Sequence, residues 1–534
     1  MTTKKVLLVV NSEYGQANVF LAAGHALQAL DKDVQIHFAS FKQIANDVAT
    51  SSKYSVKCTP GAAPWTFHLL DGPSFMEAIQ YKDGPRTALE RIMGQRPTFS
   101  SIMAMMKVLV HLFLPWDQPE FDLVYKSLVR IFDEVQPDIT VVDSLFAPGL
   151  TACRALGRRH IVLSPNTLKD FAVAFQPRAA LLWKFPIMGS AFEFLVPWRN
   201  IPANTVYGLA QIYFSLTDTR LRETRARARQ KLGAELVTFE SLMMNPPAGL
   251  KILVSNRPEI DFPLVIPGHL TACGPLIRPV APVADDDGEL DAWLRRGPTV
   301  FISLGTHRVL EEYEAVEMAR ALRVLLDAVE AWEDTLRRRG GEGGEGGEGG
   351  SNVGVGGVPG KLQVLWKLKR HKPGQDAMYE VGPGTRVHGI LRREIEADRV
   401  RIVDWVKPQP SAVLQAGTVV CSVNHGGANS FHDALTSAVP QVILPAWLDC
   451  YDFANRAEYL GIGRWGNKQA MPSCAEAELG PILVDVVLGP RAAEMRARVR
   501  DLADLCAKTP GATVAASSIL DELKSYDEGE EGEK

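Results

Sequence analysis

The sequence has few of the features that mark secreted or membrane-spanning proteins. Its seven cysteines are scattered and contain no CxxC pair, which argues against a disulfide framework and against a zinc site. It contains no Asn-x-Ser/Thr acceptor site for glycans and no uncharged apolar run of 18 residues. The apolar stretch near the start, residues 6–10, is followed by no small-residue cleavage site. We therefore expect a soluble, cytoplasmic protein without an integral membrane segment.

The sequence also lacks an excess of either charge. Lysine and arginine number 58 against 62 aspartate and glutamate, so the formal net charge is −4. A nucleic-acid-binding protein usually carries a basic excess, and the balance here argues against DNA or RNA as a partner. With 534 residues, 46% of them hydrophobic, the chain is long enough for two or three globular domains.

The N-terminal part alternates strand and helix patterns. Val6–Val10 is a continuous apolar run, Ala17–Leu30 has helix-forming composition, and Val34–Phe41 has the pattern of the next strand. A helix between two strands predicts a right-handed βαβ unit in a parallel sheet. Ile139–Asp143 and His160–Ser164 are expected to be later strands of the same sheet.

A second α/β pattern follows a proline-rich, partly acidic stretch at residues 256–297, which we interpret as a linker. One long helix is predicted at Glu311–Arg338. The predicted strands are Thr299–Leu304, Leu362–Trp366, Val400–Val403, Thr418–Val423 and Gln441–Leu444. We predict two doubly wound, Rossmann-like parallel-sheet domains that face a cleft, one at residues 1–255 and one at 298–510. Residues 511–534 would form a C-terminal helix with an acidic tail, and the Gly/Glu-rich residues 340–360 a flexible insertion.

The segment Ile102–Trp116 is apolar and rich in methionine. Methionine side chains adapt to irregular shapes, so one interpretation is the lining of a lipophilic pocket. A helix in the core of the domain fits the same pattern about equally well. Peripheral contact with a membrane is a third interpretation, and the pattern alone leaves all three open.

The most informative stretch for chemistry lies between residues 405 and 455. His425 and the two glycines after it follow a predicted strand and open a helix. Small residues at such a turn let backbone N–H groups approach an anion, so this turn could hold a diphosphate without a metal. Upstream, the indole of Trp405 can stack on a planar base. Downstream, the carboxylates of Asp433 and Asp449 can accept hydrogen bonds from ribose or sugar hydroxyls.

These residues resemble the nucleotide-sugar signature of family 1 UDP-glycosyltransferases, and the chain looks most similar to fungal members that act on natural products and phenols. The residues that match the family pattern are Trp405, Pro408, Gln409, His425, Gly427, Asn429, Ser430, Asp433, Ala434, Pro445 and Asp449. Phe301–Thr306 resembles the first strand of the family's donor domain, and Asp138–Asp143 resembles the strand that ends in its acceptor-domain aspartate. The resemblance implies the GT-B fold, with the UDP-sugar bound by the C-terminal domain.

The resemblance also implies roles for individual residues. Uracil would stack on Trp405 with Gln409 nearby, and Asp433 would hold the ribose. The residues implied for the diphosphate are Thr306, His425, Gly427, Asn429 and Ser430, while Asp449 would hold sugar hydroxyls. Cys450 stands where the family usually has the glutamine that helps to read the sugar, so the donor sugar stays open, with UDP-glucose as the default. A core histidine that caps a turn is the competing interpretation of His425.

The acceptor side departs from the family pattern at the general base. The family uses a histidine just after the first strand, oriented by the acceptor-domain aspartate. That aspartate is present as Asp143, but Gln16 stands where the histidine should be, and an amide cannot act as a base. His307 is one candidate substitute, although a solvated loop histidine fits it as well. Asp143 acting directly, with Gln16 orienting the acceptor, is another, and an acidic phenol or carboxylic acid would need the least assistance.

The predicted function is inverting, metal-independent transfer of a sugar, by default glucose from UDP-glucose, to a small lipophilic, phenolic acceptor. No prosthetic group is expected. Two alternatives stay open. One is a catalytically weak or inactive UDP-sugar-binding protein, which the missing histidine would permit. The other is a transferase that acts on a lipid acceptor such as a sterol.

Overall fold

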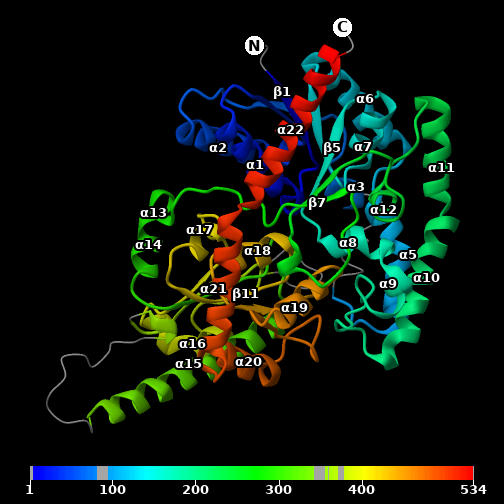
Figure 1. Cartoon of the computed structure of the whole chain (residues 1–534). Helices are drawn as coiled ribbons and strands as arrows, with labels where there is room; N and C mark the ends of the chain where they lie inside the picture. Colours follow the sequence, from blue (N-terminus) through cyan, green and yellow to red (C-terminus); the bar gives the residue numbers. More distant parts are fainter. Residues whose placement is uncertain (1–3, 81–93, 342–354, 359, 371–377, 533–534) are drawn as a thin grey trace. The chain divides into compact units, whose positions relative to one another are not determined.

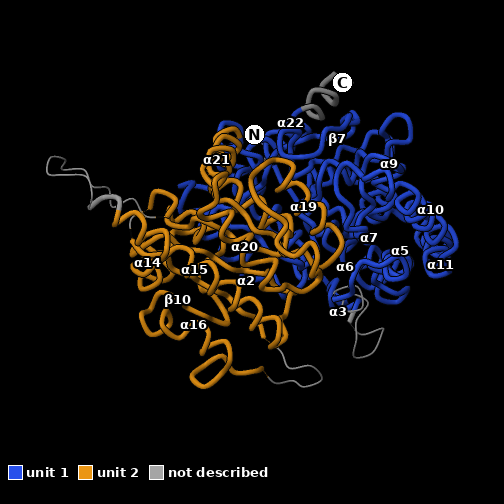
Figure 2. Tube along the Cα trace, turned by 90° about the horizontal axis from the view of Figure 1, so that it is seen from below, with its two compact units in different colours: residues 1–279, 506–534 blue, residues 280–505 orange. Residues whose placement is uncertain are grey.

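The chain divides into two compact units, which Figure 2 shows in different colours. Unit 1 consists of residues 1–279 together with 506–534, and unit 2 consists of residues 280–505. The residues that the computed structural model describes are 4–80, 94–341, 355–358, 360–370 and 378–532. Most of the predicted insertion at 340–360 therefore lies outside the described residues.

Unit 1 is built on a seven-stranded parallel sheet in the order β3-β2-β1-β4-β5-β6-β7 (Figure 1). The strands are β1 (Lys5–Val9), β2 (Gln35–Ser40), β3 (Thr66–Leu69), β4 (Ile139–Asp143), β5 (His160–Ser164), β6 (Ile252–Val254) and β7 (Leu270–Ala272). The helices are α1 (Tyr14–Leu30), α2 (Ala45–Cys58), α3 (Phe75–Gln80), α5 (Phe99–Phe113), α6 (Gln118–Val135), α7 (Ala147–Ala155), α8 (Leu168–Ala172), α9 (Ala180–Trp183), α10 (Ile201–Thr217), α11 (Thr219–Arg227), α12 (Phe239–Met244) and α22 (Gly511–Gly532).

The sheet of unit 1 is buried on both faces, which explains the continuous apolar run of β1. Val6 and Leu8 belong to a core cluster that includes Phe20 of α1 and Ile519 of α22. Val9 points to the opposite face, where it packs beside the α7 backbone. Strands covered by helices on both sides are apolar at every position rather than at alternate ones.

The predicted strands of this half agree with the structure, and two of them, β4 and β5, agree to the residue. Three strands were not predicted, because each is only three or four residues long and lies at or near an edge of the sheet: β3, β6 and β7. Residues 256–297 also differ from a plain linker. They contribute β7 to unit 1 and two short helices, α13 (Val283–Asp286) and α14 (Gly288–Leu294), to unit 2.

Unit 2 is built on a six-stranded parallel sheet in the order β10-β9-β8-β11-β12-β13. The strands are β8 (Thr299–Ser303), β9 (Gln363–Lys367), β10 (Val400–Val403), β11 (Val419–Asn424), β12 (Gln441–Ile443) and β13 (Gly463–Trp465). The remaining helices are α15 (Glu312–Gly341), α16 (Arg386–Glu396), α17 (Pro410–Leu414), α18 (Ala428–Thr436), α19 (Cys450–Tyr459), α20 (Glu476–Leu488) and α21 (Ala492–Lys508), whose last residues pass into unit 1.

Alternate side chains of β8 show how this second sheet is covered. Ile302 packs in a cluster with α15 and α20, whereas Phe301 packs on the other face with Trp293 of α14 and Ala434 of α18. Helices thus cover both faces, as in the first sheet. Each unit is therefore a doubly wound α/β structure, in agreement with the predicted fold class.

Most of the apolar segment at residues 102–116 belongs to α5, which ends at Phe113. By length and composition alone, the stretch Phe99–Val135 could cross a membrane, but 56% of its most apolar window is buried in the protein. It is also divided into α5 and α6, which end and begin at Phe113 and Gln118. Met105 and Met106 are buried. Of the three interpretations of this segment, the core helix is the one that the packing supports.

Candidate active site

The candidate donor site lies at the carboxyl edge of the sheet in unit 2. The register of the central strands pairs Ser303 of β8 with Asn424 of β11 on one side and with Lys367 of β9 on the other. Strands are added outward from β8 in one direction and from β11 in the other, so the winding reverses between them. Ligands of open α/β sheets bind outside the carboxyl ends of the strands at such a reversal.

His425, the first residue after β11, is held between two glycines. A Cβ atom added to Gly305 would lie 2.6 Å from Cε1 of the His425 ring, and one added to Gly427 would lie 2.5 Å from its Nε2. Gly305 also has a positive φ of +80°, which side chains other than glycine rarely adopt. The loops after β8 and β11 can therefore close on the imidazole only because both positions lack a side chain.

Hydrogen bonds of buried side-chain amides stabilise the turn that carries His425. The Asn424 side chain accepts a hydrogen bond from the backbone N–H of Gly426 at 2.9 Å and donates one to Gln441 at 3.0 Å. Gly426 has a φ of +81°, and a Cβ there would lie 2.8 Å from the backbone oxygen of Cys450. A buried polar network that is satisfied in this way stabilises one arrangement of the turn.

The His425 imidazole is neutral at physiological pH. Burial, together with the nearby His307 and Lys367, lowers its pKa to about 4. Its Nδ1 atom is buried and makes no hydrogen bond to the described residues, and its ring lies 5.6 Å from the Trp447 ring. A neutral imidazole can donate one hydrogen bond to an anion, so the observed environment is compatible with the predicted phosphate contact.

The helix that follows, α18, begins with Gly427 as its N-cap, and no side chain caps it. Asn429 and Ser430 lie in its first turn and are partly exposed. The open N–H groups of a helix start favour an anion, and the helix dipole adds to that preference. One turn later Asp433 is partly buried, and burial raises its pKa to about 7.

The loop after β10 carries the predicted base-stacking residue. The Trp405 side chain is 66% exposed, which is unusual for an indole in a folded core. The Lys367 ammonium lies 4.8 Å from the centre of its ring, at cation–π distance. Lys367 itself is buried, and burial lowers its pKa, with a further contribution from Lys369. One face of the indole is thus engaged by a cation.

The remaining predicted donor residues lie on neighbouring loops of the same unit. Thr306 and His307 follow β8 and are partly exposed, and the Thr306 carbonyl accepts a hydrogen bond from Lys369 at 2.7 Å. Gln409 and Asp449 are the N-cap residues of α17 and α19, and neither caps its helix with its side chain. Cys450 is buried, and burial raises the pKa of its thiol well above the usual range.

Sequence reasoning missed Lys367 and Gly305. Lys367 could have been noticed, because a lysine at the end of an otherwise apolar, buried strand is unusual. The contact of Gly305 with His425 has no signal in the sequence, since the two residues are 120 positions apart. Among the residues that the structure describes, no group of three or more His, Cys, Asp or Glu side chains is placed to hold a metal ion.

The corresponding edge of the sheet in unit 1 carries the predicted acceptor-side residues. β1 and β4 are neighbours, and the winding reverses between them as well. Asp143 ends β4 and is fully buried, and its carboxylate accepts hydrogen bonds from the Asn11 side chain at 2.6 Å and from the Leu145 N–H at 3.0 Å. Burial raises the pKa of Asp143 to about 7. Asn11, which the sequence reasoning did not single out, is therefore the partner of the aspartate.

Gln16 lies in the first turn of α1, directly after this edge, and is mostly buried. Its Oε1 atom is buried and accepts no hydrogen bond from the described residues. No hydrogen bond joins Gln16 to Asp143 in the described part of the chain. Where the family pattern has a base and its orienting carboxylate, this protein has an amide and a carboxylate that is held by Asn11.

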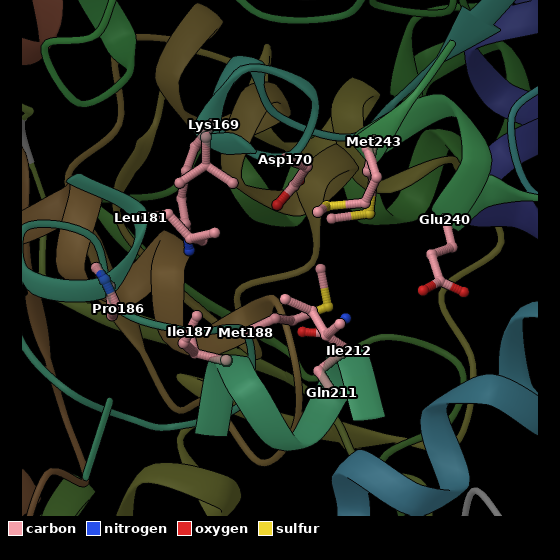
Figure 3. A pocket seen from close by; sticks show the side chains of 13 residues that line it. Lys169, Asp170, Leu181, Pro186, Ile187, Met188, Gln211, Ile212, Glu240 and Met243 are labelled. Atoms are coloured by element: carbon pink, nitrogen blue, oxygen red, sulfur yellow. The ribbon is translucent and has the colours of Figure 1, made fainter. Parts of the chain in front are cut away.

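Unit 1 also contains a largely apolar hollow that is partly open to solvent. Figure 3 shows side chains from α8, α9, α10 and α12 converging on it. Most of its lining is apolar, and three of the lining residues are Met188, Met243 and Met244. The polar groups among its lining include Lys169, Asp170 and Glu240. None of the α5 methionines, which suggested a pocket from the sequence, belongs to this lining.

Known proteins resemble the chain in sequence and in fold. It is 30% identical over 496 residues to glycosyltransferase sdnJ of Sordaria araneosa, which covers 90% of this chain and 87% of that protein. It is 36% identical over 141 residues to gallate 1-beta-glucosyltransferase 84A23 of Punica granatum, a quarter of each chain. The structure of a UDP-glucosyltransferase from Polygonum tinctorium matches 98% of this chain and 99% of that one, with a TM-score of 0.58 and 14% identity. No protein-family model matches.

The fold and the sequence together define a glycosyltransferase of the GT-B class. The chain belongs to the family 1 UDP-glycosyltransferases, as the long match to the Sordaria enzyme and the plant relatives show. The resemblance seen in the sequence is thereby confirmed, and so is the prediction of an enzyme. The roles of single site residues stay predictions.

Proposed function

We propose that this enzyme transfers glucose from UDP-glucose to an acidic oxygen of a small phenol or phenolic acid, with inversion at the anomeric carbon. The acceptor oxygen attacks that carbon, a new carbon–oxygen bond forms, and the bond from the same carbon to the β-phosphate breaks. UDP leaves with the bonding electrons. A proton still carried by the acceptor passes to a base or to water. One displacement of this kind inverts the configuration.

The donor part of the proposal is carried by one observation: His425 is clamped between Gly305 and Gly427 at the start of α18. In this proposal a neutral ring N–H of His425 and the open N–H groups of the helix start both contact the diphosphate, at the point where the sheet reverses its winding. Fixed dipoles of this kind stabilise the negative charge that develops on the leaving diphosphate, and they need no reorganisation during the reaction. Glucose is proposed because the structural relative named above is a glucosyltransferase.

Lys367 is proposed to supply the positive charge for the diphosphate. Replacing it by methionine, Lys367→Met, keeps the aliphatic stem but removes the charge. Because hydrogen bonds to charged groups contribute about 1.5–3 kcal/mol, we expect affinity for UDP-glucose to fall by roughly tenfold or more, while that for uridine changes less than about twofold. Isothermal titration of both ligands checks this. Lys361→Met, an exposed lysine near the other end of the same strand, is the control. Equal losses for uridine and UDP-glucose would contradict the proposed role.

Asp433 makes donor binding depend on pH. Its pKa in the free protein is raised to about 7, so the carboxyl group is mostly protonated below that pH and ionised above it. Ribose hydroxyls donate to the ionised form more strongly, so affinity for UDP-glucose should rise as pH increases through about 7. UDP-glucose suits the test because its own diphosphate does not titrate there. Titrations between about pH 5.5 and about 8.5 should show a rise that Asp433→Asn abolishes. If the affinity of Asp433→Asn for UDP-glucose still rises with pH, another titrating group causes the rise.

The acceptor part of the proposal rests on Gln16 and the hollow of unit 1. An acceptor that is already ionised, or that ionises easily, needs no histidine at position 16. The apolar, methionine-lined hollow suits a lipophilic or aromatic body, and its few polar groups could orient one. The acceptor in the name of the Punica relative, gallate, is a phenolic acid. We place the reaction in the cytosol, on the ground that all seven cysteines are free thiols.

The direct test is product formation. The purified enzyme is incubated with UDP-glucose and a panel of phenols and phenolic acids, and UDP release and the glycoside mass are followed together. A glycoside whose anomeric configuration is opposite to that of the donor supports the proposal. The second candidate, a UDP-sugar-binding protein without activity, is favoured by the amide at position 16. It would show saturable UDP binding but no glycoside with any donor or acceptor.

A further inference from the structure

The helix α10 contains no charged residue over its 17 positions, although much of it faces solvent. The side chains of Val206, Leu209, Tyr213 and Leu216 are between 42% and 68% exposed. Their spacing of three and four residues puts them on one face of the helix. The outward face of a soluble helix is normally polar, so a continuous apolar face of this length marks a contact surface.

The apolar face extends beyond the helix. Trp198, just before α10, is 84% exposed, and Leu195 is 60% exposed. The helix α10 packs on α5 and α9 (Figure 1), which accounts for its buried side but leaves the outer one uncovered among the described residues. Indole and phenol side chains combine an apolar body with a polar tip, and they are enriched where hydrocarbon meets water.

The stretch of sequence that contains this face has a different net charge from the whole chain. Residues 175–233 contain nine lysines and arginines against three acidic residues, whereas the chain as a whole is acidic with a net charge of −4. Exposed cations flank α10 in the sequence: Arg178 and Arg199 precede it, and Arg222 and Lys231 follow it. An apolar helix face with cations on either side is the pattern of a segment that lies in the surface of an anionic membrane.

We propose that unit 1 binds the surface of a membrane that contains anionic lipid, through the face formed by Leu195, Trp198, Val206, Leu209, Tyr213 and Leu216. A second copy of the chain is the less favourable occupant, because a symmetric pair would place two positively charged segments against each other. Anionic headgroups complement the same cations. The apolar side chains then enter the region between headgroups and acyl chains, while the cations stay at the headgroups.

The proposed membrane-binding face lies mostly on the same helix as part of the lining of the hollow in unit 1, so membrane binding could bring lipophilic acceptors to the enzyme. Gly208, Gln211 and Ile212, also on α10, line the hollow of unit 1. One helix thus separates the proposed lipid contact from the hollow proposed for the acceptor. Lipophilic acceptors partition into membranes, so an enzyme held at the surface meets them at a higher local concentration than in solution.

Co-sedimentation with vesicles tests the binding without any substrate, so its outcome is independent of the proposed transferase reaction. We expect the intact protein to sediment with vesicles of phosphatidylcholine and phosphatidylserine, and far less with phosphatidylcholine alone. High salt should weaken the binding. The double variant Leu209→Glu/Leu216→Glu should lose roughly tenfold or more of the partition, because it removes two apolar side chains and adds two anions. Glycosylation of a soluble acceptor measured without lipid should be unchanged.

The matched control is Leu30→Glu/Leu69→Glu, which places the same charges at two similarly exposed leucines of unit 1 outside this face. Its vesicle binding should equal that of the unaltered protein. Failure of the unaltered protein to bind anionic vesicles at low salt would overturn the proposal. So would sedimentation velocity that shows a dimer, abolished by the α10 variant, in a protein that ignores vesicles. That result would assign the face to a second copy.

Discussion

Replacing Gln16 by histidine is expected to raise the rate of glycosylation of an unactivated alcohol by roughly 100-fold, because a general base contributes about 10²–10⁴-fold to such reactions. The unaltered enzyme should prefer acceptors in the order of their acidity, with carboxylic acids and acidic phenols ahead of alcohols. Gln16→His should flatten that order, since an ionised acceptor gains nothing from a base. Initial rates with a series of acceptors of graded acidity measure both effects.

The pH dependence of the gain gives a second measure. Asp143 ends the strand beside the one that leads to position 16, and its raised pKa of about 7 means that it is ionised mainly above that pH. Only the ionised carboxylate stabilises an imidazolium nearby. The gain from Gln16→His should therefore be larger on the alkaline side of pH 7 than on the acid side.

Gly15→His is the control for this experiment. Gly15 is exposed, and a Cβ at this position meets nothing within 4 Å, so the variant adds an imidazole one residue away without crowding the fold. It should leave alcohol rates unchanged. If Gln16→His gains no more than Gly15→His, or if the unaltered enzyme glycosylates alcohols as fast as acids, position 16 does not limit the reaction and an acidic acceptor is no longer favoured.

Removing the His425 side chain is expected to weaken binding of UDP-glucose by roughly 10- to 100-fold. The loss follows from one hydrogen bond to a charged phosphate, worth about 1.5–3 kcal/mol, and from the space left between Gly305 and Gly427. Because burial lowers the pKa of His425 to about 4, the ring is neutral throughout the working range, and this loss should not vary between about pH 6 and about 8. Isothermal titration of His425→Ala with UDP-glucose provides the measurement.

Two further variants make this result interpretable. His388→Ala removes a partly exposed histidine from α16 of the same unit and should bind UDP-glucose like the unaltered enzyme. His425→Gln keeps a donor and should recover part of the affinity. Unchanged affinity in His425→Ala would instead favour the interpretation of this residue as a core histidine that caps a turn.

The strands with strong local patterns could be predicted from the sequence. β4 and β5 agree with their predicted bounds because a parallel strand buried on both faces is apolar at nearly every position. The short strands β6, β7 and β13 have three residues each and little pattern of their own. They form because a neighbouring strand presents unpaired backbone N–H and C=O groups to them. This pairing depends on residues elsewhere in the chain, so the residues of these strands do not show it, and the prolines around β7 made its region resemble a linker.

The sequence by itself determined the family, and it predicted the approximate place of the donor site, because the residues of the motif are close together in the chain and carry the side chains that the proposed contacts require. It also exposed the amide at position 16. Only the tertiary structure decided what surrounds these groups. Gly305 lies against the His425 ring from another loop, and the Lys367 ammonium contacts one face of the Trp405 ring. The Asn11 side chain donates a hydrogen bond to Asp143 from just after the neighbouring strand. These contacts join residues that are tens to more than a hundred positions apart, and burial, which sets their charge states, arises only when the sheets bring them together.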